Sequence, residues 1–166
     1  MLIEMNLAGV RIELPTNQPI VLLREASGTR YLPIWIGQPE AQAIAMVLQG
    51  VSSPRPMTHD LIRDLLDELG VSVVHVAVTE LRDGTFYAVL SLNRAGTTYE
   101  VSARPSDAIA LAVRLGCKIL VADDVLGEAS ILLDEEEDGE GGGGDPEEEV
   151  ERFREFLERV DPEEFR

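Results

Sequence analysis

Residues 71–92, VSVVHVAVTELRDGTFYAVLSL, decide the fold of this chain. Two runs that are rich in apolar and β-branched residues, 71–81 and 86–92, flank Arg82-Asp83-Gly84-Thr85. An Asp-Gly pair between two such runs is a strong signal for a tight β-hairpin. The stretch therefore predicts two antiparallel strands with a short turn between them.

Further strands are expected on both sides of this hairpin. Apolar stretches at 2–14, 20–25 and 30–36 are separated by Pro, Asn, Ser and Gly clusters, which is the punctuation of successive strands. Residues 97–103 and 118–122 predict two more strands, and 123–126 predict a short helical turn.

Three helices are expected between the strands. The first starts near Pro39 and carries apolar residues at helical spacing as far as Leu48. The second has Thr58 as its expected N-cap, an apolar stripe from Leu61 to Leu69, and Gly70 at its end. The third runs from Pro105 to Gly116 and is so apolar that it should be deeply buried. Together the elements predict an α+β domain, with a mixed, mostly antiparallel sheet packed with about three helices.

The end of the chain differs in composition from the rest. Residues 1–133 are expected to form the folded domain, and 134–145, which are acidic and contain four consecutive glycines, a flexible linker. Residues 146–166 predict an amphipathic C-terminal helix whose apolar side includes Phe153 and Leu157. Such a helix is not expected to be stable alone in water, so it should dock on its own domain or on a neighbouring subunit.

The acidity is concentrated in that last part. The net charge is −17; residues 134–166 hold 16 acids and 4 bases, against 15 acids and 10 bases in residues 1–133. A chain without a basic stripe lacks the usual electrostatic footprint of a tight nucleic-acid binder, which argues against stable sequence-specific DNA binding.

The single cysteine, Cys117, cannot form an internal disulfide. With no apolar stretch approaching about 20 residues, we expect a soluble, cytoplasmic protein with no membrane association.

Three polar segments, 54–60, 83–87 and 104–107, lie at the edges of these apolar elements and hold the candidate residues for chemistry. Carboxylates that hold Mg²⁺ or Mn²⁺, together with His and Arg, are the groups that commonly hydrolyse phosphodiesters. The candidate acids are Glu40, Asp60, Asp83 and Asp107. His59 could act as general base or metal ligand, and Arg55 and Arg104 could bind phosphate.

Each of these residues also has a structural interpretation. Glu40, Asp60 and Asp107 fall in the predicted first turns of helices, where a carboxylate is favoured by the helix dipole, and Asp83 suits a turn before glycine. The arginines could form internal ion pairs with these acids. If the three helices begin along one edge of the sheet, however, their free N–H groups and the arginines would converge on an anion site near His59.

Taken together in order, four segments resemble the bifunctional nuclease domain family. They are 32–37 (LPIWIG) with Glu40-Ala41, 54–61 (PRPMTHDL), 83–88 (DGTFYA) and 103–111 (ARPSDAIAL). The resemblance spans about residues 1–131 and implies a compact α+β domain that is usually oligomeric and cleaves both RNA and DNA. One departure is Ser102, because family members often carry an acid at that position, two places before the arginine of Arg-Pro-Ser-Asp.

Two functions follow as hypotheses. The first is a nuclease with Mg²⁺ or Mn²⁺ as the candidate cofactor. It would take nucleic acid as a transient substrate and work as a homo-oligomer. Its expected catalytic residues are Glu40, His59, Asp60, Asp83 and Asp107; its expected substrate-binding residues are Arg55, Arg104 and Ser106; its expected metal ligands are Glu40, Asp60 and Asp107. The second is a non-catalytic regulatory or scaffold domain that acts through oligomerisation and protein partners.

Overall fold

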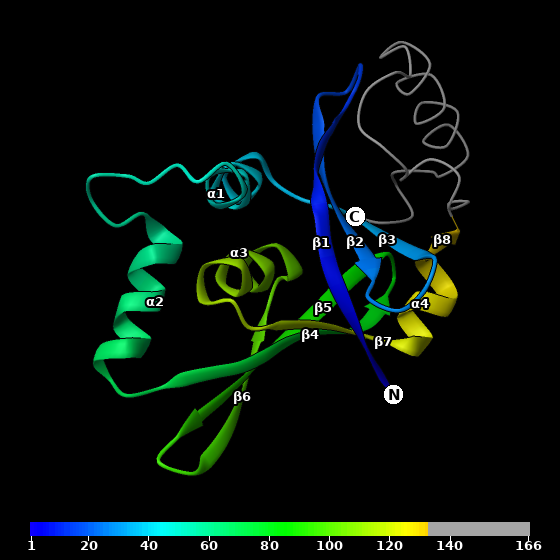
Figure 1. Cartoon of the computed structure of the whole chain (residues 1–166). Coiled ribbons are helices and arrows are strands. Elements are labelled where there is room, and N and C mark those ends of the chain that lie inside the picture. The colour runs from blue at the N-terminus through cyan, green and yellow to red at the C-terminus, as the bar shows by residue number, and fades with distance from the viewer. Residues whose placement is uncertain (133–166) are drawn as a thin grey trace.

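The computed structural model describes residues 1–132 (Figure 1). The predicted linker at 134–145 and the predicted helix at 146–166 lie outside the described residues. Within 1–132 the α+β prediction is confirmed, because a single eight-stranded sheet packs with helices. None of the helices in this part of the chain is both long and apolar enough to cross a membrane.

The sheet is mixed and mostly antiparallel. Its strands lie in the order β6-β5-β4-β7-β1-β2-β3-β8, and only the β4–β7 pair is parallel. The strands are β1 (Leu2–Glu13), β2 (Gln18–Glu25), β3 (Arg30–Trp35), β4 (Ser72–Arg82), β5 (Thr85–Arg94), β6 (Thr97–Ala103), β7 (Lys118–Ala122) and β8 (Ile131–Leu132).

The helices form two groups. Three of them, α1 (Gln38–Leu48), α2 (Thr58–Glu68) and α3 (Pro105–Leu115), lie together in Figure 1, with α3 between the other two and against β4 and β5. The fourth, α4 (Asp123–Ala129), lies apart from them and packs on β3, β4 and β7. Consequently α3 is the element through which α1 and α2 are joined.

The hairpin at 71–92 forms as the sequence predicts. Arg82 pairs with Thr85 across the turn, and the two turn residues, Asp83 and Gly84, have φ values of 50° and 74°. Two consecutive residues with positive φ give a tight turn whose twist matches that of the strands. Asn or Asp followed by Gly is the pair that adopts this backbone at least cost, which explains why the sequence signal was reliable.

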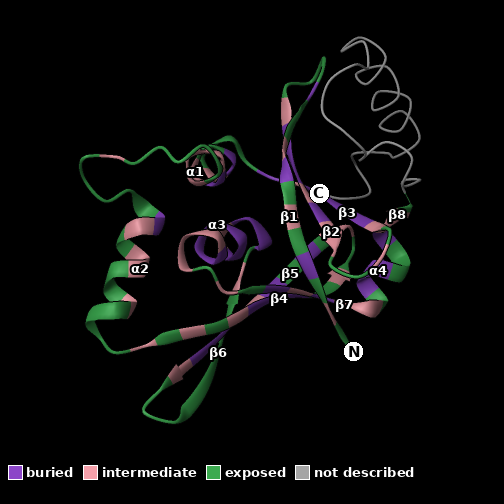
Figure 2. Cartoon of the chain, in the orientation of Figure 1, coloured by how far each residue is buried: buried purple, intermediate pink, exposed green. Residues whose placement is uncertain are grey.

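Burial is greatest in α3, as expected. Seven of its residues are buried, among them Ile109, which is 0% exposed (Figure 2). The alanines on this helix let it approach the sheet closely, and the buried face of β5, which includes Ala88 and Leu90, belongs to the same core. Only Asp107 and Arg114 interrupt the apolar composition of α3 with charge.

Three details differ from the sequence prediction. Met57, not Thr58, is the N-cap of α2; the Asp60 carboxylate accepts a hydrogen bond from the Met57 amide at 3.0 Å, and so fixes the start of the helix one residue earlier. The predicted turn at 123–126 is a helix that reaches Ala129. The short β8 was not predicted, because no alternation of apolar and polar residues marks it; it pairs with the start of β3.

We expect the replacement Ile109→Ala to lower the free energy of unfolding by about 3 kcal/mol, because it leaves a cavity in a closely packed core. Leu48→Ala is the matched control on α1, where the side chain is 50% exposed; its effect should stay below about 1 kcal/mol. Urea unfolding followed by circular dichroism measures both. Equal losses in the two variants would contradict the placement of α3 in the core.

Candidate functional site

The first turns of α1, α2 and α3 meet, and charged side chains join them. Glu40 lies in the first turn of α1, His59 in that of α2 and Asp107 in that of α3, while Arg104 is the N-cap residue of α3. The structure therefore brings together four of the residues that the sequence singled out, from segments far apart in the chain. We call these four residues the helix-start cluster.

Asp107 is the centre of the helix-start cluster. Its Oδ1 lies 2.9 Å from His59 Nε2, and its Oδ2 accepts a hydrogen bond from Arg104 Nε at 2.9 Å. The Nη2 of Arg104 donates to Glu40 Oε1, also at 2.9 Å. One chain of contacts thus runs from α1 to α2 through the start of α3, and the internal ion pairs considered for Arg104 are present.

The electrostatics of this cluster fix the state of Asp107. Burial alone would raise the pKa of Asp107, but hydrogen bonds from His59 and Arg104 outweigh it and hold the pKa below its ordinary value. An ionised Asp107 can only accept a hydrogen bond, so His59 Nε2 carries the proton and donates it in that bond. In a neutral imidazole this leaves Nδ1 as the nitrogen that can take up a proton.

Exposure separates the members of the cluster. The side chain of His59 is only 9% exposed and that of Glu40 14%, whereas that of Arg104 is 65% exposed. Arg104 uses Nε and Nη2 for its carboxylate partners, and Nη1 makes no hydrogen bond to any residue of the described part of the chain. Arg104 is therefore the member of the cluster that a solute meets first.

A second group of contacts lies beside the first and depends on Arg114, near the end of α3. The Arg114 side chain is 4% exposed, and its Nε donates to Asp60 Oδ1 at 2.8 Å. Its two Nη groups donate to the carbonyl oxygens of Ala110 and Ala43, at 2.9 and 3.0 Å. One buried guanidinium thus connects α2, α3 and α1.

Asp60 belongs to this second group rather than to the first. The hydrogen bond from the Met57 amide and the bond from Arg114 keep the pKa of Asp60 below its ordinary value, against the opposing effect of burial. The two oxygens of Asp60 accept hydrogen bonds from Met57 and Arg114. Asp60 therefore holds the helices in place, and it has no partner in common with Asp107.

The remaining candidate residues lie elsewhere. Arg55 is exposed in the loop before α2, and within residues 1–132 it forms no ion pair. Ser106 is buried in the first turn of α3, next to the cluster in sequence. Asp83 occupies the hairpin turn between β4 and β5, on a different element from any member of the helix-start cluster.

The carboxylates predicted as metal ligands do not form one ligand set. Glu40 and Asp107 share Arg104, whereas Asp60 is bound to Arg114. Among residues 1–132, no group of three His, Cys, Asp or Glu side chains could hold a metal ion. The described carboxylates therefore do not fit a divalent ion as they are placed, and the dependence on Mg²⁺ or Mn²⁺ stays a prediction.

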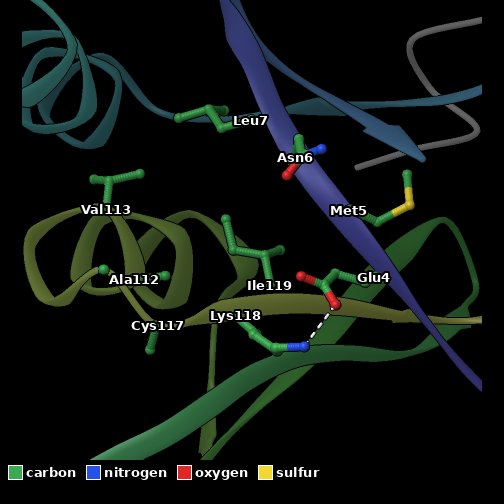
Figure 3. Close-up of a pocket in the computed structure, with 10 residues that line it drawn as sticks. Glu4, Met5, Asn6, Leu7, Ala112, Val113, Cys117, Lys118 and Ile119 are labelled. Atoms are coloured by element: carbon green, nitrogen blue, oxygen red, sulfur yellow. Dashed lines mark hydrogen bonds and ion pairs between the residues drawn. The ribbon is translucent and has the colours of Figure 1, made fainter. Parts of the chain in front are cut away.

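A hollow of about 290 Å³ lies at the other end of α3, against β1 and β7 (Figure 3). Lys118 Nζ and Glu4 Oε2 face each other there at 2.7 Å, so that their charges offset each other. Cys117 lines the same hollow, and burial raises the pKa of its thiol. A thiol with a raised pKa is a poor nucleophile, and we assign no chemistry to this hollow.

Comparison with known proteins agrees with this picture. The model of the bifunctional nuclease domain matches residues 21–134, which include the whole helix-start cluster. The chain belongs to the bifunctional nuclease domain family. This bifunctional nuclease domain protein is also 52% identical to an uncharacterized protein of Mycobacterium tuberculosis over 163 residues, 98% of either chain.

More distant relatives carry a functional name. Bifunctional nuclease 1 of Arabidopsis thaliana is 31% identical over 105 residues, which are 61% of this chain and 32% of the plant protein. Bifunctional nuclease 1 of Oryza sativa subsp. japonica is 29% identical over 106 residues, 62% of this chain and 31% of the rice protein. The chain thus corresponds to about a third of the length of each plant protein.

Sequence reasoning missed Arg114. The signal was present, since Arg114 is the one basic residue in a helix that is otherwise almost entirely apolar. A long cation on a buried helix requires partners, because a buried charge without them is costly. Finding those partners required knowing that Asp60 and the Ala43 carbonyl lie beside α3.

We expect Arg114→Met to lower the free energy of unfolding by about 3 kcal/mol, because it leaves Asp60 without its buried partner. Arg63→Met is the matched control on α2: Arg63 is 40% exposed and lies 3.9 Å from the same carboxylate. Its effect should stay below about 1 kcal/mol. Urea unfolding tests both, and a stable Arg114→Met variant would contradict the role assigned to Arg114.

We also expect acid to weaken the fold through Asp60 and Asp107. Their pKa values are lowered in the folded protein, so the unfolded chain binds protons more readily than the folded chain. The resulting stability is present above the ordinary Asp pKa of about 3.9 and is lost as the pH falls through the lowered pKa values.

Unfolding curves measured from about pH 7 to pH 3 test this linkage. Asp107→Asn should depend less steeply on pH than wild type in the acid range. The control Asp124→Asn, at an exposed position of α4, should follow wild type. An Asp107→Asn curve that is parallel to the wild-type curve would show that Asp107 does not titrate as described.

Proposed function

We propose that this protein is a nuclease that hydrolyses phosphodiester bonds of RNA or DNA at the helix-start cluster. The observation that carries the proposal is the pairing of His59 Nε2 with Asp107 at 2.9 Å, next to the exposed Arg104. Family membership and the names of the plant relatives support the same activity. RNA or DNA would be a transient substrate, in keeping with the acidity of the chain.

In this proposal, His59 is the general base and Asp107 orients it. Asp107 holds the imidazole through Nε2, so that Nδ1 receives a proton from the attacking water. The water oxygen then forms the new bond to phosphorus, and the bond from phosphorus to the leaving sugar oxygen breaks. The leaving oxygen takes a proton from the imidazolium or from solvent. A positioned base of this kind contributes about 10²- to 10⁴-fold to the rate.

Arg104 would bind the phosphate. Its Nη1 group is available while Nε and Nη2 hold Asp107 and Glu40, so the two carboxylates fix the guanidinium in one orientation. Arg55, exposed before α2, would add a second positive charge to the path of the nucleic-acid backbone. This help is needed because two carboxylates outnumber the one guanidinium in the cluster itself.

That charge balance is also the reason to test for a metal. A divalent cation brought in with the substrate phosphate would offset the excess of negative charge, and Mg²⁺ commonly uses substrate phosphates and water among its ligands. The proposed reaction uses no metal-bound group, because the described carboxylates are held by arginines. The cytoplasmic location and the homo-oligomer expected from the sequence stay predictions.

A second candidate function is a regulatory or scaffold domain. The observation that favours it is that the charged groups of the helix-start cluster satisfy one another, as they would in a purely structural network. In that case the arginines and acids would only hold the three helices together.

Cleavage of labelled single-stranded RNA and DNA by the purified protein, with Mg²⁺, Mn²⁺ or chelator, separates the two functions. We expect His59→Ala/Asp107→Asn to lose at least about 100-fold in rate, because it removes the base and the group that orients it. Arg104→Lys should weaken substrate binding, since Lys cannot hold two carboxylates and a phosphate together.

The control is His75→Ala, which changes the other histidine of the chain, on β4. All variants are prepared identically, so that a contaminating nuclease would give the same rate in each. Equal rates in wild type and His59→Ala/Asp107→Asn, or no cleavage in any sample, would reject the nuclease proposal and favour the scaffold function.

A further inference from the structure

The outer side of α2 carries a row of exposed leucines. Leu61, Leu65 and Leu69, spaced four residues apart, are 52%, 52% and 58% exposed. Leu61 and Leu65 lie on α2, and Leu69 is its C-cap residue. The apolar stripe of this helix is wider than the part that the domain covers, because Ile62 and Leu66 on its inner side are only partly buried.

An acidic row runs along the leucine row. Asp64 and Glu68 are exposed; Asp64 lies three residues after Leu61 and Glu68 three residues after Leu65, so the two rows are neighbours on the helix surface. Asp64 is paired with Arg63 at 2.8 Å. Glu68 and the nearby Asp67 form no ion pair with any residue from 1 to 132. We call the leucine row and these three acids the α2 surface.

We propose that the α2 surface docks a helical segment of another protein, one that carries apolar side chains at three- and four-residue spacing and Lys or Arg along one flank. Apolar anchors fitting a row of leucines are the usual mode of helix recognition. Lys or Arg on the flank supplies positive charge for Asp67 and Glu68, which have no ion-pair partner within residues 1–132. The leucine row is about 12 Å long, which suits about two turns of a partner helix.

Charge favours this partner over two other candidates, the end of the same chain and a second copy of the chain. The end of the chain itself, residues 134–166, holds 16 acids and 4 bases, so the acidic row would repel it. A second copy placed across a two-fold axis would set its own Asp64 and Glu68 against those of the first copy. Like charges that face each other across an interface oppose association. An anionic membrane surface or a nucleic acid would be repelled in the same way.

The α2 surface is independent of the proposed nuclease chemistry. Within residues 1–132, no leucine or acid of the α2 surface forms a hydrogen bond or ion pair with a member of the helix-start cluster; His59 binds Asp107, and Asp60 binds Arg114. Variants on the α2 surface should therefore leave the cleavage rate unchanged, and loss of docking and loss of activity are distinguishable.

The test measures fluorescence anisotropy of labelled probe peptides with the full-length chain. The first probe is a helical peptide with a leucine row and a lysine flank, the second has a glutamate flank, and the third keeps the lysines with serine in place of leucine. We expect the first probe to bind more tightly than either of the others. Its affinity should fall as salt rises, because of the flank.

Two variants of the α2 surface should weaken the first probe. Leu61→Gln/Leu65→Gln/Leu69→Gln should lower its affinity by about tenfold or more, and Asp64→Asn/Asp67→Asn/Glu68→Gln should lower it and reduce its salt dependence. The matched controls change exposed residues away from α2 and should bind as wild type. They are Leu14→Gln/Leu132→Gln for the leucines and Glu100→Gln/Asp124→Asn/Glu128→Gln for the acids.

Several results would overturn the proposal. Unchanged affinity for the first probe in both α2-surface variants would show that the probe does not bind there. Equal binding of the lysine- and glutamate-flanked probes would contradict the charge preference. Sedimentation showing that the leucine variant reduces self-association would assign the surface to a second copy. A rise in probe affinity of about tenfold in Phe153→Gln/Phe156→Gln/Leu157→Gln would assign it to the chain's own end. If the leucine variant does not fold, the charge variant and its control decide the matter.

Discussion

The buried guanidinium of Arg114 is the interaction on which the arrangement of the helices depends. It is 4% exposed and reaches the Asp60 carboxylate and the backbone of α1 and α3. A planar cation with five donors can satisfy partners on three helices at once, which a lysine could not do. Because each partner is also buried or partly buried, removing the cation would leave unpaired polar groups inside the protein. The position of α2, which packs mainly on α3, follows from this contact.

The helix-start cluster is a consequence of that packing. Once α1 and α2 are fixed against α3, their first turns bring Glu40 and His59 to Arg104 and Asp107. The carboxylates in these turns also favour the helix starts through the dipole, so the structural and the functional interpretations apply to the same residues. What distinguishes the functional one is the exposure of Arg104 at 65% beside a histidine that is oriented by a carboxylate. A structural network does not require an accessible guanidinium, whereas a contact with phosphate does.

Much of the fold could be predicted because local signals agreed with the tertiary structure. The Asp83-Gly84 turn, the glycine after α2 and the apolar α3 are each determined by backbone sterics or by helical periodicity. The candidate residues were found for the same reason, as polar groups at the ends of apolar elements. Their grouping could not be predicted, because Asp60 and His59 are adjacent in sequence yet bind different partners on α3. Arg114 escaped notice because its role depends on contacts 54 and 71 residues away in the chain.

The exposure of the α2 leucines could not be predicted from the sequence either. Periodicity correctly identified the apolar stripe but could not say how much of it the domain itself covers, because that depends on how α2 packs in three dimensions. A docking helix and a core helix have the same apolar stripe in their sequences. Only the three-dimensional arrangement separates them.

The most direct test of this account is an NMR titration of the imidazole nitrogens, because the chain has only two histidines. We expect Nε2 of His59 in the free protein to carry a proton and to donate a hydrogen bond to Asp107. Addition of a non-hydrolysable oligonucleotide should shift the His59 signals and leave those of His75 in place. Unperturbed His59 signals at saturating oligonucleotide, or a His59 tautomer protonated at Nδ1, would contradict the assignment of the helix-start cluster as a phosphodiester-cleaving site.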